Sequence, residues 1–315
     1  MITLQHSLMM LLSVDGDIEQ FKKEIAYALL PDAIRAYSGP RPYSHFEKSE
    51  DGQTSSWMKF PLDIKNLSKE MMDQVDKFLV PDIRPCCLGE DTDISAFKTH
   101  NKHLPEDYYN GVQKHLIQDM CFDKFVREQI DCSKKYESKF EIKGKKMDDK
   151  EVRAFIANME NYGFYILSKI IEHKYGITAN QEWFDQNVKP ILDEFYPQDL
   201  ADNTYKYMKI PERINDLITN HDFSEIGSFI IPVNDYLEMY GEALDNMKSQ
   251  PKRRQVLEQQ NTTKENSDLS TLIETSKEPQ KETKKEKTKS PKEPKILQNK
   301  SADANALDVI DNWMM

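Results

Sequence analysis

His115 and Asp119 are the pair of residues in this sequence best suited to metal binding or catalysis. A spacing of four puts both on one helix face with their Cβ atoms about 5–6 Å apart, close enough to share a metal ion. Gly111, Phe122 and Val126 fall on the same stripe, so we expect this face to point into the protein. Because a buried imidazole and carboxylate are costly unless they pair or bind a cation, the pattern indicates a metal site, a buried His–Asp hydrogen bond or, if exposed, a plain surface pair.

Asp32 and His45 could join such a site. Asp32 follows Pro31, just past a segment with helical periodicity, and His45 lies in an aromatic loop between Tyr43 and Phe46. Taken alone, each has a simpler interpretation, because Asp32 could cap a helix N-terminus and His45 could be a surface loop histidine. Their role therefore depends on whether the fold brings them to the first pair.

The order of these residues resembles the zinc-dependent phospholipase C superfamily, whose relatives include fungal single-strand nucleases. Its members are all-α and carry an early histidine in the first helix, then a Pro-Asp aspartate after a helix. A histidine follows about a dozen residues later, and further on comes a helix of the type G-[FY]-x-x-H-x-x-x-D. In this chain the matching residues are His6, Pro31-Asp32, His45 and the segment GVQKHLIQD at 111–119, so that the resemblance covers roughly residues 1–130.

The resemblance implies a role for each matching residue. His45, His115 and Asp119 would bind zinc. His6 would complete a second site, with Asp119 as the bridge between the two ions. Asp32 would be the base that activates the attacking water.

The chain also departs from the family pattern. Family members commonly carry another histidine one turn after the bridging aspartate, where this chain has Asp123. They also carry a later HxxxE pair, whereas neither His173 nor His221 is followed by a glutamate at that offset. We therefore expect one or two zinc ions rather than three, with His100 in FKTHN as a candidate substitute ligand.

Such a site would hydrolyse a phosphodiester or a phosphomonoester. A zinc ion lowers the pKa of bound water from about 15.7 towards 7 and stabilises charge on a phosphoryl oxygen. Arg35, Arg41 and Tyr43 lie near the expected ligands in the sequence and are candidate substrate contacts, although each could equally be solvated surface. The expected substrate is a nucleotide, a nucleic acid or a lipid headgroup.

Two other functions fit parts of the sequence. The first is a non-catalytic helical adaptor, in which the metal site has degenerated and a C-terminal segment docks to a protein partner. The second is a histidine–aspartate phosphohydrolase, but its adjacent His-Asp pair occurs only at His221-Asp222, outside the other candidates. The sequence has no Gly-rich phosphate loop and no GxSxG motif, which argues against most nucleotide-binding and nucleophile-elbow proteins.

The elements that must position these residues are helices. Only 10 glycines occur in 315 residues, and long stretches are rich in Leu, Glu, Lys, Met and Ile. We therefore predict an all-α body, with residues 138–143 as the one candidate strand. The expected helices cover residues 17–30 with Pro31 as the stop, 68–79, 106–130, 148–173, 182–195, 211–220 and 233–247.

Composition divides the chain into an acidic body and a basic tail. Residues 248–315 carry a net charge of +3 and the rest −14, which argues against a body that grips nucleic acid or an anionic membrane. We predict a single domain at 1–247, a disordered charged linker at 248–304, and an apolar docking segment at 305–315. No transmembrane segment, signal peptide or disulfide framework is evident, so we expect a cytoplasmic protein.

Overall fold

The computed structural model describes residues 3–38, 44–46, 59–68, 92–130, 140–142, 145–210 and 231–250. The regular elements of this part of the chain are helices and one short hairpin, which confirms the prediction of an all-α protein. The elements are α1 (Thr3–Ser13), α2 (Ile18–Ser38), α5 (Ile94–His100), α6 (Glu106–Gln129), β1 (Phe140–Ile142), β2 (Lys145–Met147), α7 (Asp149–Tyr175), α8 (Gln181–Asn187), α9 (Lys189–Phe195), α10 (Gln198–Met208) and α12 (Val233–Lys248).

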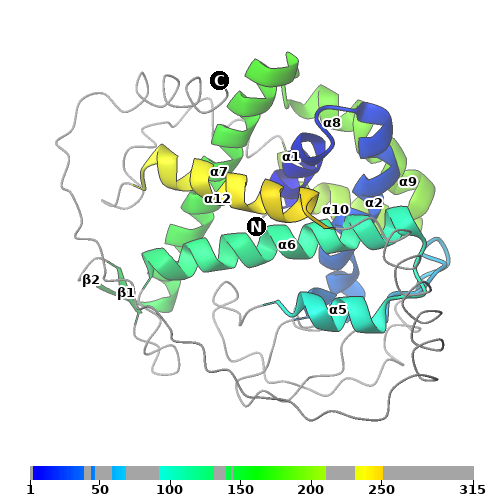
Figure 1. Cartoon of the computed structure of the whole chain (residues 1–315), viewed down its shortest axis with the longest axis horizontal. Coiled ribbons are helices and arrows are strands. Elements are labelled where there is room, and N and C mark those ends of the chain that lie inside the picture. The colour runs from blue at the N-terminus through cyan, green and yellow to red at the C-terminus, as the bar shows by residue number, and fades with distance from the viewer. Residues whose placement is uncertain are drawn as a thin grey trace, which may run out of the picture. The chain divides into compact units, whose positions relative to one another are not determined.

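Helix α6 lies at the centre of the arrangement that positions the candidate residues. It packs against α2, α5, α12 and α1, and Figure 1 shows it crossing the view between α12 on one side and α5 on the other. The predicted helix at 106–130 is confirmed almost to the residue. Phe122 and Val126 are buried with His115 and Asp119, so the face predicted from the sequence does point inward.

A tight turn sets α1 alongside α2. Asp15 and Gly16 adopt positive φ values of 52° and 80°, and the Asp17 carboxylate then accepts hydrogen bonds from the backbone amides of Glu19 and Gln20. This cap satisfies two of the amides that have no partner within the first turn of α2. The turn therefore places α1 and α2 in contact.

The helix predicted at residues 17–30 was expected to stop at Pro31. This prediction is wrong, because α2 continues through Pro31. Proline lacks the N–H group that would bond to the carbonyl of Tyr27, a loss that costs about 3 kcal/mol in a helix interior. Leu30 and Ile34, on either side of Pro31, are fully buried, and burial of such side chains contributes about 1.5–3 kcal/mol each. Burial thus outweighs the missing bond, and Asp32 lies inside the helix rather than after it.

The later helices follow the predictions with one correction. Helix α7 begins at a capping box formed by Asp148 and Glu151 and ends at Gly176, where φ is 66°. The single helix predicted at 182–195 is wrong, since the chain forms α8 and α9 with a break at Val188. Pro190 explains the break, because it lies in the first turn of α9 and cannot donate to a carbonyl of the preceding turn.

Several predictions are only partly covered by the structure. The candidate strand at 138–143 contains β1, which pairs with β2 as an antiparallel hairpin. The helices predicted at 68–79 and 211–220 lie outside the described residues, apart from Ser68. The linker and docking segment predicted for 248–315 lie outside them as well, apart from the first three residues. Helices α1, α5 and α10 were not among the expected helices.

Candidate metal centre

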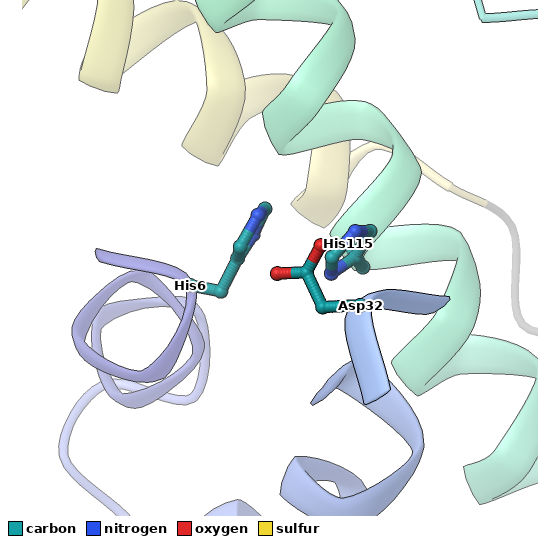
Figure 2. Close-up of side chains that lie close together, drawn as sticks. All are labelled: His6, Asp32 and His115. Carbon is teal, nitrogen blue, oxygen red and sulfur yellow. The ribbon is translucent and has the colours of Figure 1, made fainter. Parts of the chain in front are cut away.

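Five ionisable side chains from four segments, α1, α2, α6 and the short segment 44–46, lie close together, and we call them the metal centre. Figure 2 shows three of them, His6 from α1, Asp32 from α2 and His115 from α6, with their side chains directed towards one another. His45 and Asp119 complete the set. Two groups of three could each hold a cation, with ligand atoms that all lie within 4.8 Å of one another: His6, Asp32 and His115, and His45, His115 and Asp119.

The second group forms a nearly equilateral triangle of donor atoms. The Nε2 atoms of His45 and His115 are 3.2 Å apart. Asp119 Oδ2 lies 3.4 Å from His45 Nε2 and 3.3 Å from His115 Nε2. Ligands bound at 2.0–2.2 Å to a tetrahedral zinc ion are themselves about 3.3 Å apart. The three side chains thus offer the right donor types at the right spacing for zinc.

Asp32 adds a fourth donor and the only contact of the metal centre with solvent. Its Oδ1 atom lies 3.3 Å from His45 Nε2, and 16% of its side chain is exposed. The side chains of the other four residues are at most 1% exposed. Its second oxygen, Oδ2, accepts a hydrogen bond of 3.2 Å from the Thr3 hydroxyl at the start of α1. A water molecule or substrate would therefore reach the metal centre on the Asp32 side.

His6 faces the other oxygen of Asp119. Its Nε2 atom lies 3.2 Å from Asp119 Oδ1, and its ring stacks on His115 with centroids 3.9 Å apart. Within the described part of the chain, His6 Nε2 makes no hydrogen bond of good geometry. Its other nitrogen, Nδ1, is 2.7 Å from the side-chain oxygen of Gln118. Asp119 can therefore bridge two positions, with one oxygen towards His45 and His115 and the other towards His6.

A small aromatic cluster holds His45 in place. The neighbouring Phe46 is fully buried, and its ring meets that of Phe97 edge-on with centroids 5.5 Å apart. The backbone amide of Asp93 donates to the Phe46 carbonyl at 2.8 Å. On the ring itself, Nδ1 of His45 is 2.8 Å from the Ser44 hydroxyl, so that Nε2 points to the other ligands. The histidine that the sequence placed in a loop is thus anchored from the α5 side.

A close helix crossing fixes the separation of α2 and α6. A Cβ atom on Gly111 would lie 2.7 Å from the Glu24 carbonyl oxygen and 3.0 Å from the Ala28 backbone nitrogen, so glycine is required at this position. Lys114 then forms an ion pair of 2.6 Å with the Glu24 carboxylate. His115 and Asp32 come four residues after Gly111 and Ala28. The glycine contact therefore determines how near these two side chains lie.

Burial and neighbouring charges set the protonation of the metal centre. Burial, followed by the like charge of His115, lowers the pKa of His6, although Asp119 and Asp32 act in the opposite direction. Burial by itself would raise the pKa of Asp32, but the hydrogen bond with His45 and the nearby imidazoles outweigh it, so that this pKa is lowered. At neutral pH His6 is thus neutral and Asp32 is ionised, the forms in which each binds a metal.

Of the other predicted site residues, only His100 has a side chain that the structure describes, and it does not join the metal centre. His100 is the exposed last residue of α5 and belongs to neither group of candidate ligands. Arg35 lies in α2, three residues after Asp32, but its side chain is outside what the structure describes. Arg41 and Tyr43 lie outside the described residues altogether.

Three supporting residues were missed by the sequence analysis. Thr3, Ser44 and Gln118 contact Asp32, His45 and His6 through hydrogen bonds. Ser44 precedes His45 and Gln118 precedes Asp119, so a polar residue beside a candidate ligand was the only signal available. For Thr3 the sequence holds no such signal, because its partner is 29 residues away.

Comparison with protein-family models, with curated proteins and with solved structures found no match to this chain. Among the described helices, none is both long and apolar enough to cross a membrane.

Proposed function

We propose that this protein is a metal-dependent phosphoesterase that hydrolyses a phosphodiester or a phosphomonoester with zinc-activated water. The observation that carries the proposal is the donor triangle of His45, His115 and Asp119, whose sides measure 3.2, 3.3 and 3.4 Å. A shared cation accounts for all of them.

The spacing favours zinc over a hard octahedral cation. Magnesium requires ligands at about 2.0–2.1 Å in octahedral geometry, which puts neighbouring donors about 2.9 Å apart. The triangle is wider than that, and two of its three donors are imidazoles, which suit zinc better than magnesium. The ionised carboxylate of Asp32 also places negative charge among buried imidazoles, and a divalent cation would balance that charge.

When bound, zinc would supply Lewis acidity and lower the pKa of a water molecule to about 7. His45, His115 and Asp119 would hold it, and the chain contributes the rest. Asp32 is ionised and partly exposed, so it can accept the proton of the attacking water at Oδ1. The Thr3 hydroxyl holds Oδ2 of Asp32 and keeps the other oxygen directed at the ligands.

The choice of phosphate esters rests on the resemblance of the residue order to the phospholipase C superfamily. What supports it is that His6, Asp32, His45, His115 and Asp119 are the residues that the resemblance selects, and that they lie together in one buried cluster. A zinc centre with an adjacent carboxylate base is suited to in-line attack of water on phosphorus.

The first test is the metal content of purified protein. We expect about one or two zinc ions per chain in the wild type, and loss of the metal in His115→Ala and Asp119→Ala. His100→Ala is the matched control, because His100 is an exposed histidine outside the centre and its removal should leave the metal content unchanged. Wild-type protein without stoichiometric metal would overturn the proposal.

The second test is hydrolysis of bis-p-nitrophenyl phosphate and of a chromogenic phosphocholine ester. We expect zinc-dependent turnover that Asp32→Asn reduces about 100-fold or more, the usual contribution of a positioned base. Asp32→Asn should keep most of its zinc, because the donor triangle remains. Protein that binds zinc but hydrolyses neither ester would retain the metal centre and exclude this activity on these substrates.

A further inference from the structure

A buried glutamine on α6, Gln118, contacts Nδ1 of His6, the ring nitrogen that points away from the metal centre. Both side chains are fully buried. The glutamine side-chain oxygen is 2.7 Å from His6 Nδ1, and its side-chain nitrogen donates to the sulfur of Met247 on α12 at 3.3 Å. Gln118 thus lies in a chain of contacts that runs from α12 to α1.

Met247 determines which way the amide of Gln118 points. A thioether sulfur can accept a hydrogen bond but cannot donate one. The amide nitrogen, which carries hydrogens, therefore belongs beside the sulfur, and the amide oxygen is left to face His6. Since this oxygen can only accept, the proton of the neutral His6 ring must lie on Nδ1.

This tautomer leaves a lone pair on His6 Nε2. That lone pair is 3.2 Å from Asp119 Oδ1, which is itself an acceptor. Two acceptors at this distance in a buried place repel each other unless a cation lies between them. The missing hydrogen bond of His6 Nε2 within the described residues agrees with this arrangement.

We propose that Gln118 is a positioning residue that holds His6 in the Nδ1–H form, so that Nε2 and Asp119 Oδ1 together offer a second cation position. The proposal rests on the zinc centre of the proposed function but not on its phosphoesterase activity. Partners of this kind orient a metal-binding histidine through its other ring nitrogen, and their loss typically weakens metal binding about 10–100-fold.

The opposite arrangement is chemically distinct. If the amide were reversed, its nitrogen would donate to Nδ1 and the proton of His6 would lie on Nε2. That proton could then be donated to Asp119, and the two residues would form an ordinary buried hydrogen bond with no place for a cation. The tautomer of His6 therefore distinguishes a ligand from a structural histidine.

Nitrogen NMR of the metal-free protein reads the tautomer directly. With ¹⁵N-labelled histidine, we expect His6 to be protonated on Nδ1 in the wild type and in Gln118→Glu, whose carboxylate also only accepts. Gln118→Leu should lose this preference and populate the Nε2–H form. A wild-type His6 protonated on Nε2 would overturn the inference, whether or not the protein binds zinc.

Zinc titration by calorimetry gives the second measurement. We expect Gln118→Leu to weaken the binding step that His6→Ala abolishes by about 10–100-fold, and Gln118→Glu to retain it. Gln5→Leu is the matched control, because Gln5 is also fully buried and also joined to α12, through a 3.0 Å hydrogen bond to the Tyr240 hydroxyl. Equal weakening in Gln5→Leu, or none in Gln118→Leu, would overturn the inference.

The two proposals fail in different ways. Wild-type protein that binds no zinc would overturn the proposed function, and the NMR measurement would still report on Gln118. Wild-type protein that binds zinc with no effect of His6→Ala would leave the donor triangle intact and overturn only the proposed role of Gln118 and His6.

Discussion

Neighbouring residues of α1 point into two different buried polar regions. His6 belongs to the metal centre. Gln5 belongs to a tyrosine cluster, which consists of Tyr162 on α7 and Tyr236 and Tyr240 on α12 together with Gln5. Gln5 donates to the Tyr240 hydroxyl at 3.0 Å, and the Tyr236 hydroxyl donates to a backbone carbonyl of α7 at 3.2 Å. Both regions lie in the same helical body and are similarly buried.

The difference between them lies in what their polar atoms meet. In the tyrosine cluster each hydroxyl of α12 has a partner within the protein, and the rings pack edge-on, as Tyr162 does on Tyr236 at 5.3 Å. In the metal centre, His6 Nε2 lies 3.2 Å from Asp119 Oδ1 and makes no hydrogen bond of good geometry within the described residues. The tyrosine hydroxyls are thus paired within the protein, whereas the proposed function gives the metal centre a cation as its further component.

The sharpest way to break this comparison is to add and remove zinc. Zinc at 1,000 times its dissociation constant should stabilise the wild type by about 4 kcal/mol, and Asp119→Asn should abolish this gain because it removes the bridging charge. Tyr240→Phe should keep the full gain while lowering the baseline stability. Chemical denaturation with zinc and with EDTA measures both. A gain of equal size in Asp119→Asn would show that zinc acts elsewhere.

A smaller effect is expected from adding one methyl group at each of two glycines. In Gly111→Ala the new Cβ would meet backbone atoms of α2 at 2.7 and 3.0 Å, whereas in Gly163→Ala it would meet the ends of the Gln5 and Tyr240 side chains. Overpacking of this kind costs about 1–3 kcal/mol. We expect both variants to lose stability, but only Gly111→Ala to weaken zinc binding at the other group of candidate ligands, His6, Asp32 and His115, because it separates His115 from Asp32.

Calorimetric zinc titration of the two variants checks this prediction. Gly163→Ala serves as the control for Gly111→Ala, since both replace a helical glycine at a close contact. Weakened zinc binding in Gly163→Ala alone would contradict the role assigned to the contact between α2 and α6.

Gly111 and Gly163 also show which features of the fold the sequence can predict and which it cannot. Spacing alone predicted α6, α7 and the inward direction of His115 and Asp119, because helical periodicity is a local property. It could not predict that Gly111 brings α2 within backbone contact, since that depends on a partner far away in the chain. For the same reason it failed at Pro31, where the burial of Leu30 and Ile34 outweighs a local helix-breaking signal.

For the metal centre too, the sequence predicted some features and not others. Its five members were selected from residue type, from their order and from the resemblance, all of which can be taken from the sequence alone. The sequence could not show which atoms of these side chains face one another. Only the fold shows that Asp119 directs its two oxygens to different histidines, and that Thr3 and Gln118 hold Asp32 and His6 from outside the cluster.

The smallest expected effects concern how the stability of the metal-free protein depends on pH. The metal centre should affect stability at acid pH and the tyrosine cluster at alkaline pH. Burial and the like charge of His115 lower the pKa of His6, so on acidification the unfolded chain takes up a proton before the folded one does. The free energy of unfolding should therefore fall as the pH drops below about 6.5, the ordinary pKa of histidine. Burial raises the pKa of Tyr236 and Tyr240, so stability should also fall as the pH rises above about 10.

Two variants test which region causes each loss of stability, the one at acid pH (the acid limb) and the one at alkaline pH (the alkaline limb). One group contributes at most about 1.4 kcal/mol per pH unit, so each variant should flatten its own limb only in part. Urea denaturation in EDTA between pH 5 and 11 should show a shallower acid limb in His6→Asn and a shallower alkaline limb in Tyr240→Phe. If His6→Asn left the acid limb unchanged, His6 would have to take up its proton equally well in the folded chain. It would then already be paired as a cation with Asp119, and the metal centre would satisfy itself as the tyrosine cluster does.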